Sequence, residues 1–141
     1  MLLRERKMRI IEVLTRVFVM PEVFRSTVAH YRTLTGGRCT LHFQFPSRNL
    51  ELAAVSSPRA SFLILGGSTE DLQPHRETRL TIVVDDIETV AEAITSAGAT
   101  LVQVPTPVPV GFQARATHPG GLLIEYVQHT AAAAQYQNPT L

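Results

Sequence analysis

Few side chains in this sequence have the types and spacing that chemistry requires. The 141 residues include one cysteine, five histidines and no tryptophan. The histidines are widely separated, so they do not show the spacing of a structural zinc site. A glycine-rich phosphate loop, a nucleophile elbow and a Ser, His and Asp arrangement are also missing from the sequence. Any chemistry must therefore come from isolated charged side chains that the fold brings together.

The single cysteine and a nearby histidine are weak candidates for a reactive site. Cys39 falls in the same strand register as Leu41 and Phe43, so we expect a small buried core residue and not a nucleophile. His42 falls on the opposite face, and we expect it to be solvated or hydrogen-bonded. One cysteine also excludes a disulfide framework and is typical of the reducing cytosol.

Composition and charge limit the class of protein. With 45% hydrophobic and 18% charged residues, the chain can bury one sizeable core. The formal charge is +1, but four of the thirteen basic residues lie within positions 1–9. The rest has nine basic against eleven acidic side chains, so no basic stripe is available for a nucleic acid. No apolar run resembles a signal peptide or approaches bilayer length, and we expect a cytoplasmic protein without a membrane partner.

Hydrophobic periodicity predicts a strand, a helix and three further strands in the first half of the chain. Residues 10–19 are apolar and β-branched, as in a strand. Pro21 suits the first helical position, and Gly36 suits the end of a helix. The expected buried face of this helix carries Val23, Val28, Tyr31 and Leu34. After the helix, the apolar pattern predicts strands over 40–45, 50–55 and 60–65.

The second half has the same predicted order of elements. A strand over 80–84 precedes an amphipathic helix that ends at Gly98. Asp85 and Glu88 stand three residues apart as a capping pair. Prolines at every second position of the next strand remove its donors along one edge, which places it at a rim of the sheet; they are Pro105, Pro107 and Pro109. Strands over 112–117 and 122–128 complete a hairpin.

Short identities support a twofold internal repeat. Thr15-Arg16-Val17 recurs as Thr78-Arg79-Leu80, and Thr27-Val28-Ala29 recurs as Thr89-Val90-Ala91. Both copies occupy the same order of predicted elements, which makes chance a poor explanation. The repeat divides the chain into a basic extension over 1–9, a first module over 10–67, a linker over 68–77, a second module over 78–129 and a C-terminal tail over 130–141.

Three motifs carry a family resemblance. They are Val28-Ala29-His30-Tyr31-Arg32 through Gly36, Val83-Val84-Asp85-Asp86, and Thr117-His118-Pro119-Gly120-Gly121-Leu122-Leu123-Ile124-Glu125. Over residues 10–129 the chain resembles the glyoxalase, bleomycin-resistance and extradiol-dioxygenase superfamily, also called the vicinal oxygen chelate superfamily. The resemblance implies an α+β fold in which two βαβββ modules form a cup-shaped mixed sheet, with the helices outside and the ligand site inside. It also implies a homodimer.

The resemblance further implies where a metal would bind. In metal-using members four ligands line the cup, and the corresponding positions here are Arg16, Leu63, Arg79 and Glu125. Arginine stays protonated near neutral pH and leucine has no donor atom, so only Glu125 is a possible ligand. We therefore expect no cofactor, with a divalent metal held through other residues as the alternative.

Strand alternation places Arg79 and Glu125 on the side of the predicted sheet that faces into the cup. Two interpretations remain open. In one, the two side chains form an internal ion pair that replaces the charge of the metal. In the other, Arg79 and Arg16 bind an anionic or carbonyl-bearing small molecule, which Glu125 orients. A pair that also lines the ligand site satisfies both.

Three functions fit these expectations. The first is a metal-independent small-molecule-binding protein, comparable to the resistance proteins of the superfamily, with an anionic or neutral ligand at the Arg/Glu site. The second is a lyase, isomerase or dioxygenase of the same fold that uses Glu125 as its catalytic residue, with or without a divalent metal. The third is a ferredoxin-like regulatory domain, which three strands after each helix disfavour.

Overall fold

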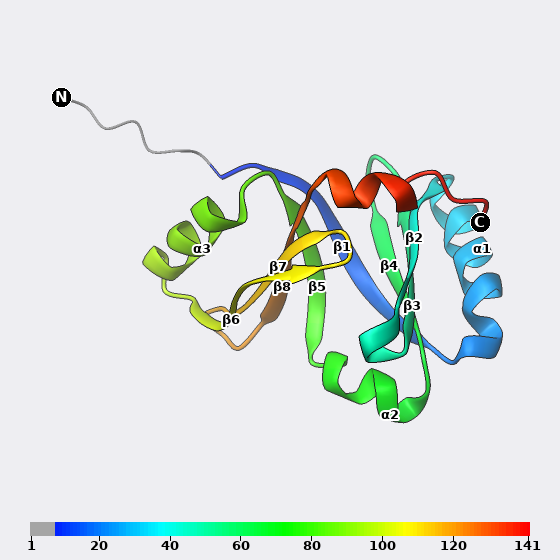
Figure 1. Cartoon of the computed structure of the whole chain (residues 1–141), viewed down its shortest axis with the longest axis horizontal. Helices are drawn as coiled ribbons and strands as arrows, with labels where there is room; N and C mark the ends of the chain where they lie inside the picture. The colour runs from blue at the N-terminus through cyan, green and yellow to red at the C-terminus, as the bar shows by residue number, and fades with distance from the viewer. Residues whose placement is uncertain (1–7) are drawn as a thin grey trace.

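The chain folds around one eight-stranded sheet, which a computed structural model describes over residues 8–141 (Figure 1). Most of the expected basic extension, residues 1–7, lies outside the described residues. The strand order is β2-β3-β4-β1-β5-β8-β7-β6. In chain order the strands are β1 Ile10–Val19, β2 Arg38–Phe45, β3 Leu50–Ser56, β4 Ser61–Gly66, β5 Thr78–Val84, β6 Thr100–Val108, β7 Gly111–Thr117 and β8 Leu123–His129.

The two halves of the sheet have the same internal order. β1 and β5 meet at the centre as an antiparallel pair. Each of them lies parallel to the last strand of its own half, which is β4 for β1 and β8 for β5. The outer strands of each half follow as antiparallel neighbours. The predicted α+β class, with one curled mixed sheet and helices outside, is confirmed.

Both α-helices and short 3-10 helices accompany the sheet in the described part of the chain. The α-helices are α1 Phe24–Thr35, α2 Thr69–Leu72 and α3 Ile87–Ser96, and the short 3-10 helices are η1 Pro21–Val23, η2 Pro46–Arg48, η3 Gln73–His75 and η4 Ala131–Tyr136. Figure 1 shows α1 and α3 at opposite ends of the molecule. Over residues 8–141, none of the helices has both the length and the apolar character needed to span a membrane.

α1 packs on the first half of the sheet through Phe24 and Val28, which are fully buried. As predicted, the helix ends at Gly36, whose φ of 70° is the left-handed conformation that favours glycine. Val23 and Leu34 were expected on the buried face, but both are exposed. The 3-10 turn η1 precedes the α-helix, so the buried stripe starts at Phe24 and not at Val23.

α3 buries Ile87, Val90 and Ile94 of its predicted apolar stripe against the second half of the sheet, whereas Ala97, the last predicted member, is exposed at the C-cap. Its N-cap differs from the prediction by one residue. Asp86, and not Asp85, accepts hydrogen bonds from the backbone N–H groups of Glu88 and Thr89, because Asp86 is the residue directly before the first helical turn.

β6 lies at an edge of the sheet, as its prolines predict. It pairs with β7 alone, and the pairing is irregular between Gln103 and Thr106, where Pro105 has no N–H to donate. The predicted rim position of this strand is confirmed.

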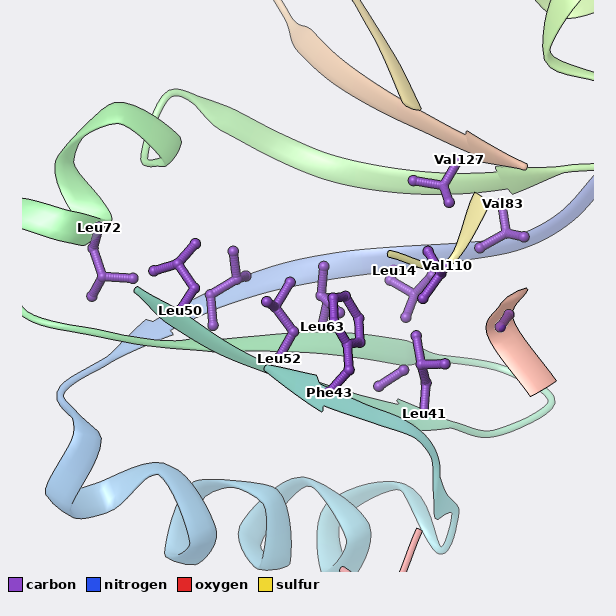
Figure 2. Packing of buried hydrophobic residues seen from close by; sticks show 13 residues of the cluster. Leu14, Leu41, Phe43, Leu50, Leu52, Leu63, Leu72, Val83, Val110 and Val127 are labelled. Atoms are coloured by element: carbon purple, nitrogen blue, oxygen red, sulfur yellow. The ribbon is translucent and has the colours of Figure 1, made fainter. Parts of the chain in front are cut away.

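The concave side of the sheet holds an apolar cluster from both halves. Figure 2 shows the side chains of β2 and β3 pointing away from α1, toward those of β5 and β8. Leu14 of the central strand β1 lies between the two groups. The buried members are Leu14, Leu41, Phe43, Leu50, Leu52, Ala54, Leu63, Leu65, Leu72, Val83, Val110, Val127 and Ala133.

Two segments outside the sheet cover this concave side. The segment 68–77, expected to be a linker, forms α2 and η3 and contributes the fully buried Leu72. The C-terminal segment 130–141 forms η4, which contacts β2 and β7 and crosses between the two halves in Figure 1. Its Ala133 is fully buried, and the Tyr136 ring lies 5.4 Å from the Phe43 ring. Both segments therefore complete the core.

Replacing Gly111 by alanine should destabilise the start of β7. Gly111 has a φ of +150°, and a Cβ at this position would overlap the carbonyl oxygen of Gln128 on β8. We expect Gly111→Ala to lower the free energy of unfolding by about 2 kcal/mol or more, measured by urea denaturation. The control is Gly120→Ala, because Gly120 has a φ of +94° but open space around it, so only about 1 kcal/mol should be lost. Equal losses in the two variants would contradict this account.

Candidate functional site

The concave side of the sheet encloses a cavity of about 370 Å³. This volume lies within the range of about 300–1,000 Å³ that is usual for small-molecule sites. Its walls are mainly aliphatic and aromatic, from Leu14, Leu41, Phe43, Phe45, Leu50, Leu52, Ala54, Leu63, Leu65, Val83, Val108, Val110 and Val127. The polar residues that line the same cavity are Glu12, Arg16, Thr40, Arg48, Ser56, His75, Thr81, Gln113, Glu125, His129 and Gln137.

A buried ion pair joins the two halves of the sheet at one end of the cavity. The Arg16 guanidinium lies with Nη2 3.0 Å from Oε1 of Glu125, and the two side chains are 4% and 8% exposed. Thr81 lies between them: its hydroxyl accepts from Arg16 Nε at 3.0 Å and donates to Glu125 Oε1 at 2.9 Å. Arg16 Nη1 also donates to the backbone carbonyl of His75 at 3.2 Å. All four groups thus form one closed network.

Strand order and alternation explain this network. Arg16, Thr81 and Glu125 come from β1, β5 and β8, which are neighbours in the sheet. Side chains alternate between the two faces of a strand, so Arg16 shares the concave face with Leu14 two residues earlier. Thr81 and Glu125 are paired directly across β5 and β8, which brings both within reach of the arginine.

The expected pair of Arg79 with Glu125 is wrong. Arg79 is exposed and does not line the cavity. The pairing of β5 with β8 runs from Thr78 to Leu123 and then from Leu80 to Ile124, so Arg79 is the extra residue of a β-bulge. The bulge turns its side chain out of the alternation, and Arg16 takes the place that Arg79 was expected to fill beside Glu125.

Leu63, the remaining predicted site residue, lines the cavity from β4. It is paired with Arg16 across β1 and β4 and is 5% exposed. The structure therefore brings Arg16, Leu63 and Glu125 together at the centre of the sheet, with Thr81 in place of Arg79. The proposed binding roles of these residues stay predictions.

The donor set at these four central positions does not fit a divalent metal. A guanidinium and a leucine have no lone pair to offer, and the threonine hydroxyl is already used by Arg16 and Glu125. Within the described residues, no three His, Cys, Asp or Glu side chains gather closely enough to hold an ion. The positive charge that a metal would bring beside Glu125 is supplied by Arg16.

Arg48 lines the cavity near the same network and was not singled out from the sequence. It ends η2, and the following Asn49 has a φ of 52°. Its guanidinium lies 4.3 Å from the centre of the Phe45 ring. Burial lowers the pKa of Arg48, Glu125 raises it, and Arg115 and Arg16 lower it further. A non-repetitive turn has no hydrophobic period, so no sequence signal directs this side chain to the cavity.

His75 also lines the cavity, although it lies in the segment expected to be a linker. Burial is the main cause that lowers its pKa, and the charges of Arg48 and Arg16 lower it further. The ring is therefore neutral near neutral pH, and the positive charge at this end of the cavity comes from arginine side chains.

A third arginine adjoins this end of the cavity from β7. Arg115 Nε donates to Oε1 of Gln103 at 2.9 Å, and Gln113 Nε2 donates to the same oxygen at 3.2 Å. Gln113 lines the cavity, and the charge of Arg115 acts on the pKa of both Arg48 and His75. Three arginines therefore surround one carboxylate, Glu125.

The opposite end of the cavity carries a second polar group. Glu12 lies four residues before Arg16 on β1, about 13 Å away along the strand, and its Oε2 accepts from the Ser61 hydroxyl at 2.7 Å. His129 of β8 lines this end as well. Burial lowers the pKa of His129, and Glu12 raises it in part. The cavity thus has an aliphatic middle between two polar ends.

The other reactive side chains have structural roles. Cys39 is 5% exposed and burial raises the pKa of its thiol, which confirms the expected core residue. His42 Nε2 lies 2.6 Å from Oε2 of Glu51, with its ring 6.0 Å from that of Phe24 of α1, outside the cup. His118 is likewise hydrogen-bonded, at 2.6 Å, to the Tyr126 hydroxyl.

Solved structures identify relatives of this chain. No protein-family model and no curated protein matches it. An uncharacterised protein from Methanosarcina mazei is 30% identical, with a TM-score of 0.75 over 87% of this chain and 95% of that protein. The chain and the Methanosarcina mazei protein belong to one family. The match extends over most of both chains, so the two members of this family share their architecture.

More distant structures identify the fold. A methylmalonyl-CoA epimerase from Mycobacterium tuberculosis is 17% identical, with a TM-score of 0.59 over 86% of this chain and 91% of that one. A Streptomyces coelicolor methylmalonyl-CoA epimerase in complex with 2-nitronate-propionyl-CoA is 16% identical. Its TM-score is 0.59 over 86% of this chain and 96% of that one. These epimerases have the vicinal oxygen chelate fold, so the fold implied by the three sequence motifs is confirmed for this family.

Removing one partner of the buried Arg16–Glu125 pair should destabilise the protein. Removing both charges should restore part of the lost free energy of unfolding. We expect Arg16→Met to lower the free energy of unfolding by about 3–5 kcal/mol, because Glu125 is left charged and unpaired. Adding Glu125→Gln to this variant should recover more than about 1 kcal/mol. Chemical denaturation measures the free energy of unfolding of Arg16→Met and of the double variant that also carries Glu125→Gln.

The matched control is Arg79→Met, which removes an exposed arginine. Its loss should stay within about 0.5 kcal/mol. A larger effect at Arg79 than at Arg16 would contradict the assigned pairing.

The buried histidines should make the protein less stable in acid. The folded-state pKa values of His75 and His129 are lowered, so the unfolded chain binds more protons below a pH of about 6.5. The contribution of these two histidines to the free energy of unfolding is fully present above that pH. It decreases with acidification until the folded-state pKa values are reached. The double variant His75→Gln/His129→Gln should flatten the slope of unfolding free energy between about pH 7 and pH 5. Identical slopes in the double variant and the native protein would contradict this assignment.

Proposed function

We propose that this protein is a metal-independent binding protein for a small neutral or anionic molecule. The observation that carries the proposal is the cavity of about 370 Å³ with the Arg16–Glu125 pair at its polar end. An apolar enclosure with a few fixed polar groups is the usual form of a small-molecule site. The ion pair stands where the resemblance implies a metal, and it lines the ligand space.

The charges around the cavity favour an anionic or neutral ligand over a cation. Arg16, Arg48 and Arg115 outnumber Glu125 at one end, while Glu12 at the other end is hydrogen-bonded to Ser61. A cationic drug of the kind that some resistance proteins sequester would meet like charge at the first end. A resistance-type role is therefore proposed only for neutral or acidic compounds.

An enzyme that uses Glu125 as a general base is the alternative. The epimerases of similar fold give this alternative its reaction class. In this chain, however, Oε1 of Glu125 is in contact with Arg16 and accepts from the Thr81 hydroxyl, and these contacts hold the carboxylate against β5. A carboxylate fixed in this way is well placed to orient a ligand.

Filling the cavity should abolish binding without unfolding the protein. Ala54 lines the cavity from β3, so Ala54→Leu places three more carbon atoms inside it. Ala93→Leu makes the same change on the exposed side of α3. In a thermal-shift and calorimetric screen of small neutral and acidic compounds, ligands of the native protein should bind Ala93→Leu unchanged and lose at least about tenfold in affinity for Ala54→Leu.

The same screen tests independence from metal. Chelator treatment should leave these affinities unchanged. Stoichiometric nickel, zinc, manganese or iron by elemental analysis, with an affinity that falls in Glu125→Gln, would contradict the proposal and favour the metal-dependent enzyme.

Two further expectations belong to the same proposal. A homodimer follows from the family resemblance, and light scattering of the full chain tests it directly. A cytoplasmic location is proposed from the single cysteine, which is typical of the reducing cytosol.

A further inference from the structure

The charges at the arginine end of the cavity do not cancel. Arg16 and Glu125 neutralise each other within one hydrogen-bonded network. Arg115 is held by the neutral side chain of Gln103. Arg48 also carries a positive charge, since an arginine stays protonated in proteins. The arginine end of the cavity therefore keeps a net positive charge after the carboxylate of Glu125 is counted.

Arg48 is the cation that is open to a ligand. Within residues 8–141 its guanidinium forms no hydrogen bond and no ion pair, and its one close partner is the face of the Phe45 ring at 4.3 Å. No fully buried side-chain nitrogen or oxygen among the described residues lacks a partner, so the donors of Arg48 are accessible. Because Arg48 also lines the cavity, these donors can meet a molecule bound there.

The wall that continues from Arg48 is aliphatic. Leu50, two residues later on the chain, lines the same cavity and is 2% exposed. In Figure 2 Leu50, Leu52 and Leu63 follow one another along this wall, with Leu14 of β1 farther on. A cationic fork at one end and a run of leucines behind it match a molecule with an anionic head and an aliphatic chain.

We propose that the cavity binds an aliphatic carboxylate, with the carboxylate group on Arg48 and the hydrocarbon chain along the leucine wall. The proposal rests on the proposed binding function and specifies its ligand class. A guanidinium offers two parallel N–H donors that match the two oxygens of a carboxylate. Arg16 is less suited to this part, because each of its three nitrogens already has a partner, in Glu125, Thr81 or the His75 carbonyl.

Three probes with the same eight-carbon chain isolate the role of the head group: octanoate, 1-octanol and octylammonium. In calorimetric titration of the full chain at neutral pH, affinity should decrease from octanoate to octanol to octylammonium. We expect octanoate to bind about tenfold or more tightly than octanol, because a charge-assisted hydrogen bond exceeds a neutral one.

Arg48→Gln should bring the affinity for octanoate down to about that for octanol, because the charge that distinguishes the two head groups is gone. Octanol binding that is still measurable shows that the cavity is folded in this variant. The matched control is Arg76→Gln, because Arg76 also lies over an aromatic ring, that of Phe18 at 5.5 Å, but does not line the cavity. This control should keep the full preference for octanoate.

Octanoate binding no more tightly than octanol, an unchanged preference in Arg48→Gln, or no binding of any octyl probe would each overturn this proposal. The broader proposal is judged separately. If another compound binds the native protein and loses affinity in Ala54→Leu, the cavity is a binding site for a different ligand class.

Discussion

The buried pair of Arg16 and Glu125 is the constraint on which the centre of this molecule depends. Arg16 belongs to the first half of the sheet, and Thr81 and Glu125 belong to the second. An unpaired charge at this depth would be strongly destabilising, so the network holds β1, β5 and β8 in one register. The joint between the two halves is thus electrostatic as well as hydrogen-bonded through the backbone.

The same pair decides the chemistry of the cavity. Arg16 balances the charge of Glu125 within the sheet, and Leu63 beside Arg16 adds an apolar side chain to the same part of the cavity. The remaining positive charge, on Arg48 and Arg115, lies around this neutral centre. The cup is covered by α2, η3 and η4, and its walls are mainly apolar.

The site residues differ in how far the sequence alone could place them. Glu125 could be placed because the resemblance implies a ligand position on the last strand, and that strand alternates regularly after a recognisable hairpin turn. Arg79 was misplaced because the Thr-Arg repeat suggested equivalence with Arg16, whereas a bulge at Arg79 displaces the register. Strand alternation places Thr81 on the face of β5 that lines the cup. No sequence signal identifies it as the hydrogen-bond partner of Arg16 and Glu125. Arg48 and His75 lie in 3-10 turns, where no periodic signal indicates the direction of a side chain.

Local rules determined the elements of this protein. Pro21 begins the 3-10 turn that precedes α1, and Gly36 ends α1 in the left-handed conformation. The apolar periods identified the strands and α3, and the prolines of β6 required an edge position. Long-range pairing decided the partners inside the cup. Whether Arg16 or Arg79 meets Glu125 depends on the bulge in β5, and whether Arg48 reaches the cavity depends on how a turn packs against β3. These outcomes require the folded sheet, because they follow from the relative positions of strands that are distant in the sequence.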